Sequence, residues 1–125
     1  MALQSYKELV AWQKGIEFVA EIYRSTRSFP KEELYGLTNQ LRRAAVSIPS
    51  NIAEGQGRLT RGEFKQFLGH ARGSLFEVES QLVMARMLGY LPEEHAEKLL
   101  RRVEELGRIL NGLLNSLDRK LSTIH

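Results

Sequence analysis

Apolar residues recur along the chain at alternating steps of three and four, which is the period of an α-helix and not of a strand. The pattern falls into four blocks and predicts helices at about residues 5–27, 31–55, 60–88 and 92–121. The core-facing positions of the first two blocks are Leu9, Trp12, Ile16, Val19 and Tyr23, then Leu34, Leu37, Leu41, Ala44 and Ile48. Those of the last two are Phe64, Leu68, Ala71, Leu75, Val78, Leu82 and Ala85, then Leu99, Val103, Leu106, Leu110, Leu113 and Leu117.

Two helix starts carry the spacing of a capping box, in which a hydroxyl and a glutamate three residues later satisfy each other's free backbone N–H groups. Ser5 with Glu8 opens the first block, and Thr60 with Glu63 opens the third. The connections between the blocks are short, so neighbouring helices are expected to run antiparallel. The sequence therefore predicts one all-α domain over residues 1–125, folded as an antiparallel up-down four-helix bundle.

Proline and glycine mark the end of the second block. Pro49 falls inside the helical pattern, where it removes one backbone hydrogen bond, so we expect a kink there and not a stop. Gly55 and Gly57 follow and are expected to end the helix in a left-handed cap.

The block at 60–88 carries a second stripe opposite its core stripe. This stripe consists of Gly69, Gly73, Phe76, Ser80, Val83 and Met87. Only one face of a helix reaches the core of a monomeric bundle, and paired glycines let another helix approach closely. We interpret the second stripe as an oligomer interface; a loop or neighbouring helix of the same chain is the alternative cover.

Charge is unevenly distributed, although the net charge is only +3. Residues 42–72 hold six basic and two acidic residues, whereas the remainder holds 12 basic and 13 acidic. The chain has no cysteine, which excludes a disulfide framework and thiol catalysis. Residues 1–7 lack a signal-peptide core and no apolar run is long enough to span a membrane, so we expect a cytoplasmic protein without a membrane partner.

Several segments resemble one known family, in order and over nearly the whole chain. They are LVAWQ at 9–13, FPK at 29–31, YGL at 35–37, QLRRAA at 40–45, SIPSNIAEGQG at 47–57, GSL at 73–75 and LGYL at 88–91. Together they resemble the four-helix-bundle proteins encoded within intervening sequences of bacterial 23S ribosomal RNA genes. Members of that family are similar to the accessory proteins of diversity-generating retroelements, which form ring-shaped pentamers with a basic surface beside a reverse transcriptase and its RNA. The resemblance thus implies a ring-shaped homo-oligomer, a pentamer, whose partners are RNA and a reverse transcriptase or other nucleic-acid enzyme.

The candidate nucleic-acid-binding residues are the cations of the basic segment. They are Arg42, Arg43, Arg58, Arg61, Lys65 and Arg72. Lysine and arginine contacts to phosphate supply most sequence-independent binding to nucleic acids. The alternative is that these cations form surface or inter-subunit ion pairs, with Glu54 as the partner of Arg42 or Arg43. Asn51 and Glu54 are interpreted as buried polar partners that hold the bend at Pro49, with a role in a site as the alternative.

No catalytic motif is recognisable, and the histidines lack the Glu-x-x-His spacing of di-iron bundles, so we expect no metal and no cofactor. Arg119 and His125 have the spacing of the Arg/His pair of a class of helical ribonucleases, which leaves a ribonuclease as a distant alternative. The sequence favours a non-enzymatic, oligomeric helical bundle that binds RNA or a nucleic-acid enzyme through its basic residues. An oligomeric protein scaffold without a nucleic-acid role is the first rival.

Overall fold

Four long α-helices make up the structure. The computed structural model describes the backbone of residues 5–124 and the side chains of residues 5–118. The α-helices are α1 (Val10–Thr26), α2 (Leu37–Gln56), α3 (Arg61–Met87) and α4 (Glu93–Ile124), and the short 3-10 turns are η1 (Tyr6–Glu8) and η2 (Lys31–Glu33). The described residues contain no strand, so the expected all-α class with four helices is confirmed.

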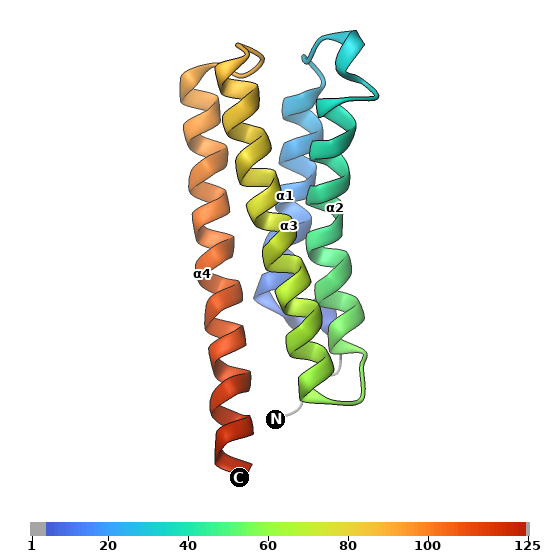
Figure 1. Cartoon of the computed structure of the whole chain (residues 1–125), viewed down its shortest axis with the longest axis vertical. Helices are drawn as coiled ribbons and strands as arrows, with labels where there is room; N and C mark the ends of the chain where they lie inside the picture. Colours follow the sequence, from blue (N-terminus) through green and yellow to red (C-terminus); the bar gives the residue numbers. More distant parts are fainter. Residues whose placement is uncertain (1–4, 125) are drawn as a thin grey trace.

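The helices lie side by side along one axis and alternate in direction (Figure 1). α2 packs most extensively against α3, and α1 and α4 make the least extensive contact between neighbouring α-helices. Among the described residues, α1 contacts α2 and α4 but lies diagonally across from α3. The helices therefore follow one another around the bundle in chain order.

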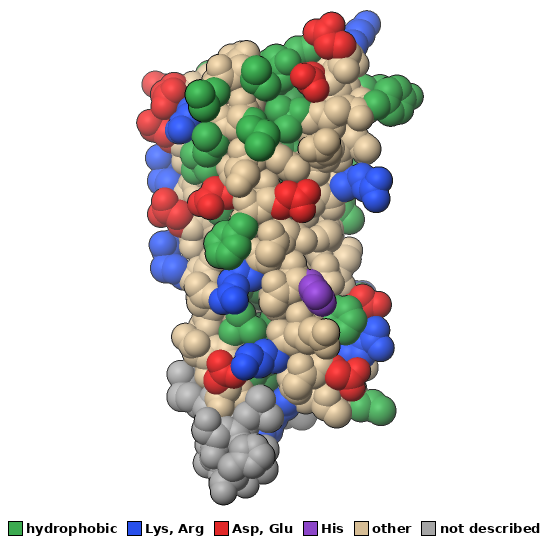
Figure 2. All heavy atoms as spheres, viewed as in Figure 1, with side chains coloured by type: hydrophobic (Ala, Val, Ile, Leu, Met, Phe, Trp, Pro, Cys, Tyr) green, Lys and Arg blue, Asp and Glu red, His purple; other side chains and the backbone are tan. Residues whose placement is uncertain are grey.

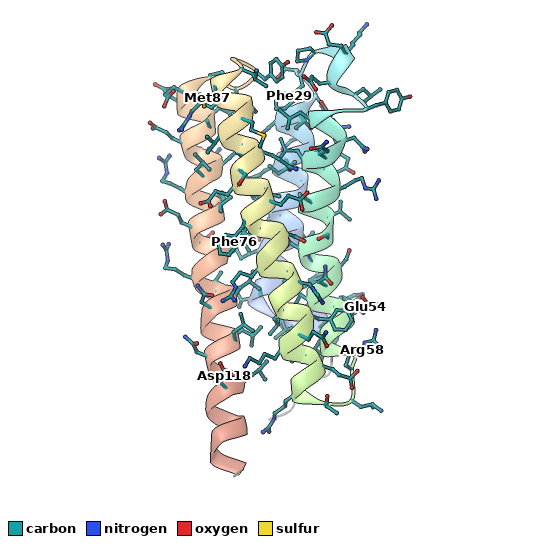
Figure 3. The ribbon with its side chains drawn as sticks, in the orientation of Figure 1. Phe29, Glu54, Arg58, Phe76, Met87 and Asp118 are labelled. Atoms are coloured by element: carbon teal, nitrogen blue, oxygen red, sulfur yellow. The ribbon has the colours of Figure 1, made fainter. Side chains whose placement is uncertain are left out.

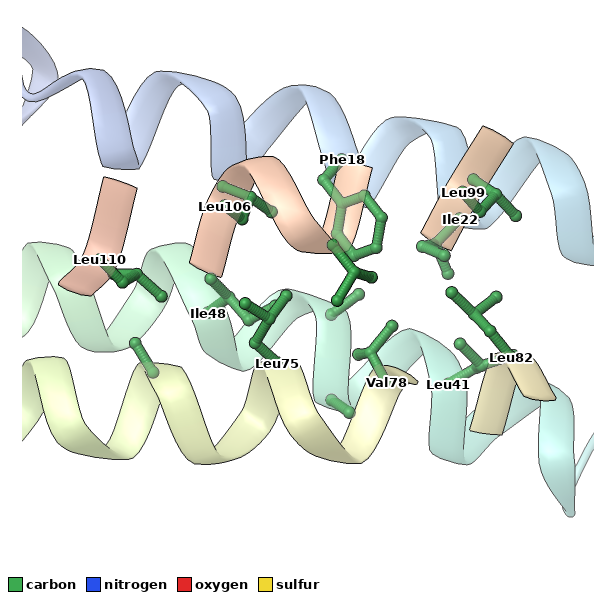
Figure 4. Close-up of a cluster of buried hydrophobic side chains, with 14 of the residues drawn as sticks. Phe18, Ile22, Leu41, Ile48, Leu75, Val78, Leu82, Leu99, Leu106 and Leu110 are labelled. Carbon is green, nitrogen blue, oxygen red and sulfur yellow. The ribbon is translucent and has the colours of Figure 1, made fainter. Parts of the chain in front are cut away.

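One apolar core runs through the bundle, to which every helix contributes (Figure 4). The largest fully buried side chains come from all four helices: Phe18, Ile22, Leu41, Ile48, Ile52, Leu68, Leu75, Val78, Leu82, Leu99, Leu106 and Leu110. The stripe predicted for α3 is buried from Leu68 to Ala85, with Phe64 half-buried. In α4 the predicted stripe is buried from Leu99 to Leu110, but Leu114 replaces Leu113 as the buried residue.

The predicted stripe of the first helix is wrong by one position. The buried face of α1 consists of Ala11, Gly15, Phe18, Ile22, Ser25 and Thr26. Ile16 and Tyr23 are exposed, and Trp12 is only half-buried. A β-carbon placed on Gly15 would lie 3.3 Å from the Pro49 β-carbon, so small residues on α1 are what lets α2 approach.

Both of the first two helices begin later than expected. The Ser5 hydroxyl accepts a hydrogen bond from the Lys7 N–H (3.1 Å) and caps only the η1 turn. Leu9 is extended, so α1 starts at Val10. Similarly, α2 starts at Leu37 after the η2 turn, and Leu34, predicted as a core residue, is exposed.

The boundaries of α3 agree closely with the pattern. The Thr60 hydroxyl accepts a hydrogen bond from the Glu63 N–H (3.1 Å) and donates one to the Glu63 carboxylate (3.2 Å). At the other end, Gly89 takes the left-handed conformation with φ of +78°, which glycine adopts without strain.

α2 continues through Pro49 to Gln56. The expected continuation past the proline is confirmed, while the kink itself stays a prediction. The left-handed cap expected at Gly55 or Gly57 is wrong, because Gly55 lies inside the helix and Gly57 has a right-handed φ of −79°. Gly55 instead allows close packing, since a β-carbon there would lie 2.6 Å from the Phe67 β-carbon.

Candidate subunit and nucleic-acid interfaces

The outer face of α3 is apolar and uncovered by the rest of the described chain. Phe76 and Met87 are 55% and 81% exposed, and both lie on the face that Figure 3 presents. A β-carbon added at Gly69 or Gly73 would have no neighbour within 4 Å, so nothing in the described chain packs over this stretch of α3. Ser80 is exposed and its hydroxyl turns back to the Phe76 carbonyl (3.1 Å).

Two neighbouring residues extend this face beyond the predicted stripe. Met84 is 51% and Leu88 58% exposed, whereas Val83 is half-buried. Apolar side chains gather over the upper part of this face of the molecule (Figure 2). Pattern reasoning missed Met84 and Leu88 because a single stripe of residues is narrower than the surface that an exposed helix presents. We call the exposed set Phe76, Met84, Met87 and Leu88 the α3 patch.

A second apolar surface, absent from the sequence predictions, lies between α1 and α2. It is an open hollow of about 280 Å³. Its lining residues are Tyr6, Trp12, Ile16, Val19, Val46, Pro49, Ser50 and Ala53. Three of these belong to the stripe predicted for the core of the first helix, so the stripe marks a real apolar surface that faces outward. Tyr6 packs edge-on against Trp12, with ring centroids 5.3 Å apart, at one end of the hollow.

The six candidate nucleic-acid-binding cations do not form one surface. Arg42 donates to the Thr26 hydroxyl (2.9 Å) and lies over the Tyr23 ring, so it packs against the end of α1. Arg72 donates to the Asn111 side-chain oxygen (3.0 Å) on α4. Arg43 is exposed on α2, and along a helix axis it lies roughly 20 Å from Arg58 at the α2–α3 turn.

The remaining three cations lie at the α2–α3 end, where carboxylates balance them. Arg58 pairs with Glu54 (3.5 Å) and lies over the Phe67 ring. Lys65 pairs with Asp118 of α4. With Arg61 and Glu63 included, three cations and three carboxylates of the described side chains lie at this end. These six charges therefore sum to zero.

Asn51 is a structural polar residue of α2, as expected, whereas Glu54 differs from its expected role. The Asn51 amide donates to the Ser47 carbonyl (2.7 Å) within α2, and the Ser47 hydroxyl contacts that of Ser74 on α3. Asn51 is thus a half-buried structural residue near the contact between α2 and α3. Glu54 is exposed and pairs with Arg58, so its interpretation as a buried polar partner, and as the partner of Arg42 or Arg43, is wrong.

A carboxylate at the opposite end ties η2 to the α3–α4 turn. Glu33 accepts hydrogen bonds from the Leu37 N–H (3.1 Å) and the Tyr90 hydroxyl (2.8 Å). These two donors, the Leu37 N–H first, lower the pKa of the Glu33 carboxyl. The same contact raises the pKa of Tyr90, because the carboxylate disfavours the phenolate. Tyr90 also packs against Phe29 (ring centroids 5.5 Å apart), so this contact fixes the turn and is structural.

Few groups with metal-binding or catalytic chemistry come together. Among the described residues, no three His, Asp or Glu side chains are grouped as a metal site requires. Arg119 and His125, the distant ribonuclease candidates, lie outside the described side chains. The helices that the structure describes lack an apolar stretch long enough to cross a membrane.

These features define a helical bundle with apolar outer faces and scattered surface cations. Residues 7–112 match the family described as 23S rRNA-intervening sequence protein, and the chain belongs to that family. It is also similar to a solved structure from Bacteroides thetaiotaomicron, a protein of unknown function from the S23 ribosomal protein family. The TM-score is 0.76 at 23% sequence identity, with 84% of this chain and 98% of that chain covered. No curated protein matches the chain.

Proposed function

We propose that the protein is a non-enzymatic, homo-oligomeric helical module, and that the α3 patch is one side of its subunit contact. The observation that carries this proposal is the exposure of Phe76, Met84, Met87 and Leu88 on one helix face. A regular apolar face of this kind marks an interaction surface. The uncovered glycines beside it leave room for a second helix to approach closely.

The second copy meets this patch with its hollow between α1 and α2. The two surfaces lie on different sides of the bundle, because α1 is diagonal to α3. A contact between two different surfaces is head-to-tail, and it closes into a ring when the rotations between successive copies add up to one full turn. The ring-shaped pentamer implied by the family resemblance is the assembly that we propose.

RNA is the ligand that we propose for this module, with a nucleic-acid enzyme as a further partner. Support comes from the family, whose description refers to intervening sequences of 23S rRNA, and from the positive net charge of the chain. Repeating a positively charged surface around a ring strengthens its field and attracts polyanions. A scaffold without a nucleic-acid role is the rival, in which charges serve only as ion pairs.

Sedimentation of matched variants tests the oligomer. The double variant Phe76→Glu with Met87→Glu should sediment as a monomer while keeping wild-type helicity, because charge on the patch opposes burial. Leu59→Glu is the control, since Leu59 is 99% exposed at the α2–α3 turn, away from the patch. A wild-type chain that is monomeric at micromolar concentration, or a double variant that assembles normally, would refute the proposal.

A further inference from the structure

The seam between α1 and α4 is lined by charged side chains, among which cations outnumber carboxylates. Two open hollows of about 230 and 410 Å³ follow one another along it, and a third of about 300 Å³, lined by α4 residues alone, adjoins the second. The first two share Arg24 and Lys98, and the last two share Lys98 and Arg102. They form one continuous groove, which begins between α1 and α4, the neighbouring helix pair with the least contact, and continues over the exposed face of α4.

The groove has an excess of positive charge, in contrast to the α2–α3 end. Its basic lining residues are Arg24, Lys98, Arg101, Arg102 and Arg108, and its acidic ones are Glu17, Glu21 and Glu105. The groove thus carries a charge of +2, whereas the six described charged side chains named at the α2–α3 end sum to zero.

Ion pairs inside the groove leave most of its cations available. Arg102 contacts both Glu21 (3.3 Å) and Glu105 (3.7 Å), so one arginine holds two of the three carboxylates. Among the described side chains, no carboxylate lies within ion-pair distance of Lys98, Arg101 or Arg108. At one end the Ser25 hydroxyl and the His95 imidazole, 2.8 Å apart, add polar groups suited to an anionic ligand.

The spacing of the cations fits an extended ligand. Lys98, Arg101 and Arg108 lie on one side of α4 over roughly 15 Å of helix. A single phosphate needs donors that converge on one point, whereas a row of cations follows a phosphodiester backbone. Within the described part of the chain, no Phe, Tyr or Trp lines the groove, so stacking on bases is not part of this site.

We propose that the α1–α4 groove binds the phosphodiester backbone of RNA without base preference. This inference rests on the proposed RNA-binding function and assigns it to residues outside the basic segment of the sequence. The groove lies on a side of the bundle that neither the α3 patch nor the α1–α2 hollow uses. Every copy in a ring therefore presents its groove to the solvent, and one RNA strand can contact several copies.

A charge-matched pair of triple variants tests the assignment. The groove variant is Lys98→Gln, Arg101→Gln and Arg108→Gln, all exposed residues; Arg102 is kept because of its two ion pairs. The control is Arg58→Gln, Arg61→Gln and Lys65→Gln, which removes the same charge from the α2–α3 end. The probes are labelled oligouridine and oligoadenine of equal length, titrated at several salt concentrations.

The groove variant should bind both probes more weakly and by the same factor. The plot of log affinity against log salt concentration should become less steep by about 2. Each phosphate contact to a single strand contributes roughly 0.7 to the magnitude of this slope, and the variant removes three cations. The control should keep the wild-type slope. Circular dichroism and sedimentation should match the wild type for both variants, because exposed substitutions of this kind change stability little.

Each other outcome overturns a distinct claim. If the wild type binds RNA and the control alone binds more weakly, the groove assignment is wrong and the proposed function stands. Equal weakening in both variants would mean that binding is spread over the surface, which also refutes the groove. If the wild type binds neither probe, the RNA-binding function and the groove assignment fail together, and the scaffold rival is favoured.

Discussion

Gly55 determines how closely α2 and α3 pack. A β-carbon at this position would lie 2.6 Å from the Phe67 β-carbon and 3.1 Å from the Phe64 Cδ1 atom. The first of these atoms is next to the backbone and cannot swing away, so the helices themselves must move apart. Sequence alone marked this glycine as a helix end, because a pattern does not reveal which helix lies opposite.

Gly55→Ala should therefore destabilise the protein, although alanine favours helices. Overpacking costs about 1–3 kcal/mol, which exceeds the gain of about 1 kcal/mol in helix propensity. Gly112→Ala is the matched control, because a β-carbon there has no neighbour within 4 Å. Urea unfolding at one protein concentration should show lower stability for the first variant and slightly higher stability for the second. An equal gain in the free energy of unfolding for both variants would mean that α2 and α3 do not pack as described.

The contact between Glu33 and Tyr90 makes stability depend on pH. The folded pKa of Glu33 lies below its unfolded value, so its contribution is present above the unfolded pKa and is lost as pH falls through the folded pKa. The raised pKa of Tyr90 has the opposite sign, and its contribution is lost as pH rises through the folded value.

Tyr90→Phe should lower the melting temperature at neutral pH, and its difference from the wild type should shrink in acid as Glu33 becomes protonated. Tyr35→Phe controls for loss of a hydroxyl, since Tyr35 is 91% exposed. This variant should have the melting temperature of the wild type at every pH. Thermal unfolding followed by circular dichroism between neutral and acidic pH measures both. A constant difference across that range would show that Tyr90 does not stabilise the ionised carboxylate.

Among the helices, α3 was the most predictable and α1 the least. Most residues in the stripe of α3 are large and apolar and a capping box precedes it, so pattern and structure agree. α1 has two adjacent stripes, and the buried one contains Ala11 and Gly15 while the outward one contains Trp12, Ile16 and Val19. Prediction from hydrophobicity selected the stripe with the larger residues as the buried one. The close approach of α2 instead requires the small residues of the other stripe.

A substitution on the outer face of α3 should affect assembly of the oligomer but not folding of the single chain. Gly73→Leu should leave the fold intact, because a β-carbon at Gly73 has no neighbour within 4 Å in the isolated chain and leucine favours helices. It should weaken assembly, since the added bulk keeps a second helix away. Sedimentation velocity should show dissociation for Gly73→Leu, and Gly112→Leu on α4 is the control with equal bulk. Normal assembly of Gly73→Leu would place the subunit contact elsewhere.

At the scale of the whole molecule, the fold separates the charges that the sequence concentrates in residues 42–72. Residues 42–72 are strongly basic in the chain, but Asp118 comes from α4 to pair with Lys65, and Arg42 turns back onto α1. The reverse holds for the α1–α4 groove, whose cations are interspersed with glutamates along α4. Helical periodicity puts several of those glutamates outside the groove, which a running count of charges does not reveal.

Salt should separate the two interactions that we propose. The subunit contact is apolar, and rising salt does not weaken burial of apolar surface. Binding to RNA releases counterions, so its affinity falls steeply as salt rises. A mixture of protein and labelled oligouridine, sedimented over a series of sodium chloride concentrations, should lose its RNA while the protein keeps the sedimentation coefficient of the oligomer. The Leu59→Glu variant should behave in the same way. If the oligomer instead dissociates as salt rises, ion pairs hold the subunits together, and the cations of this chain serve assembly as the scaffold rival requires.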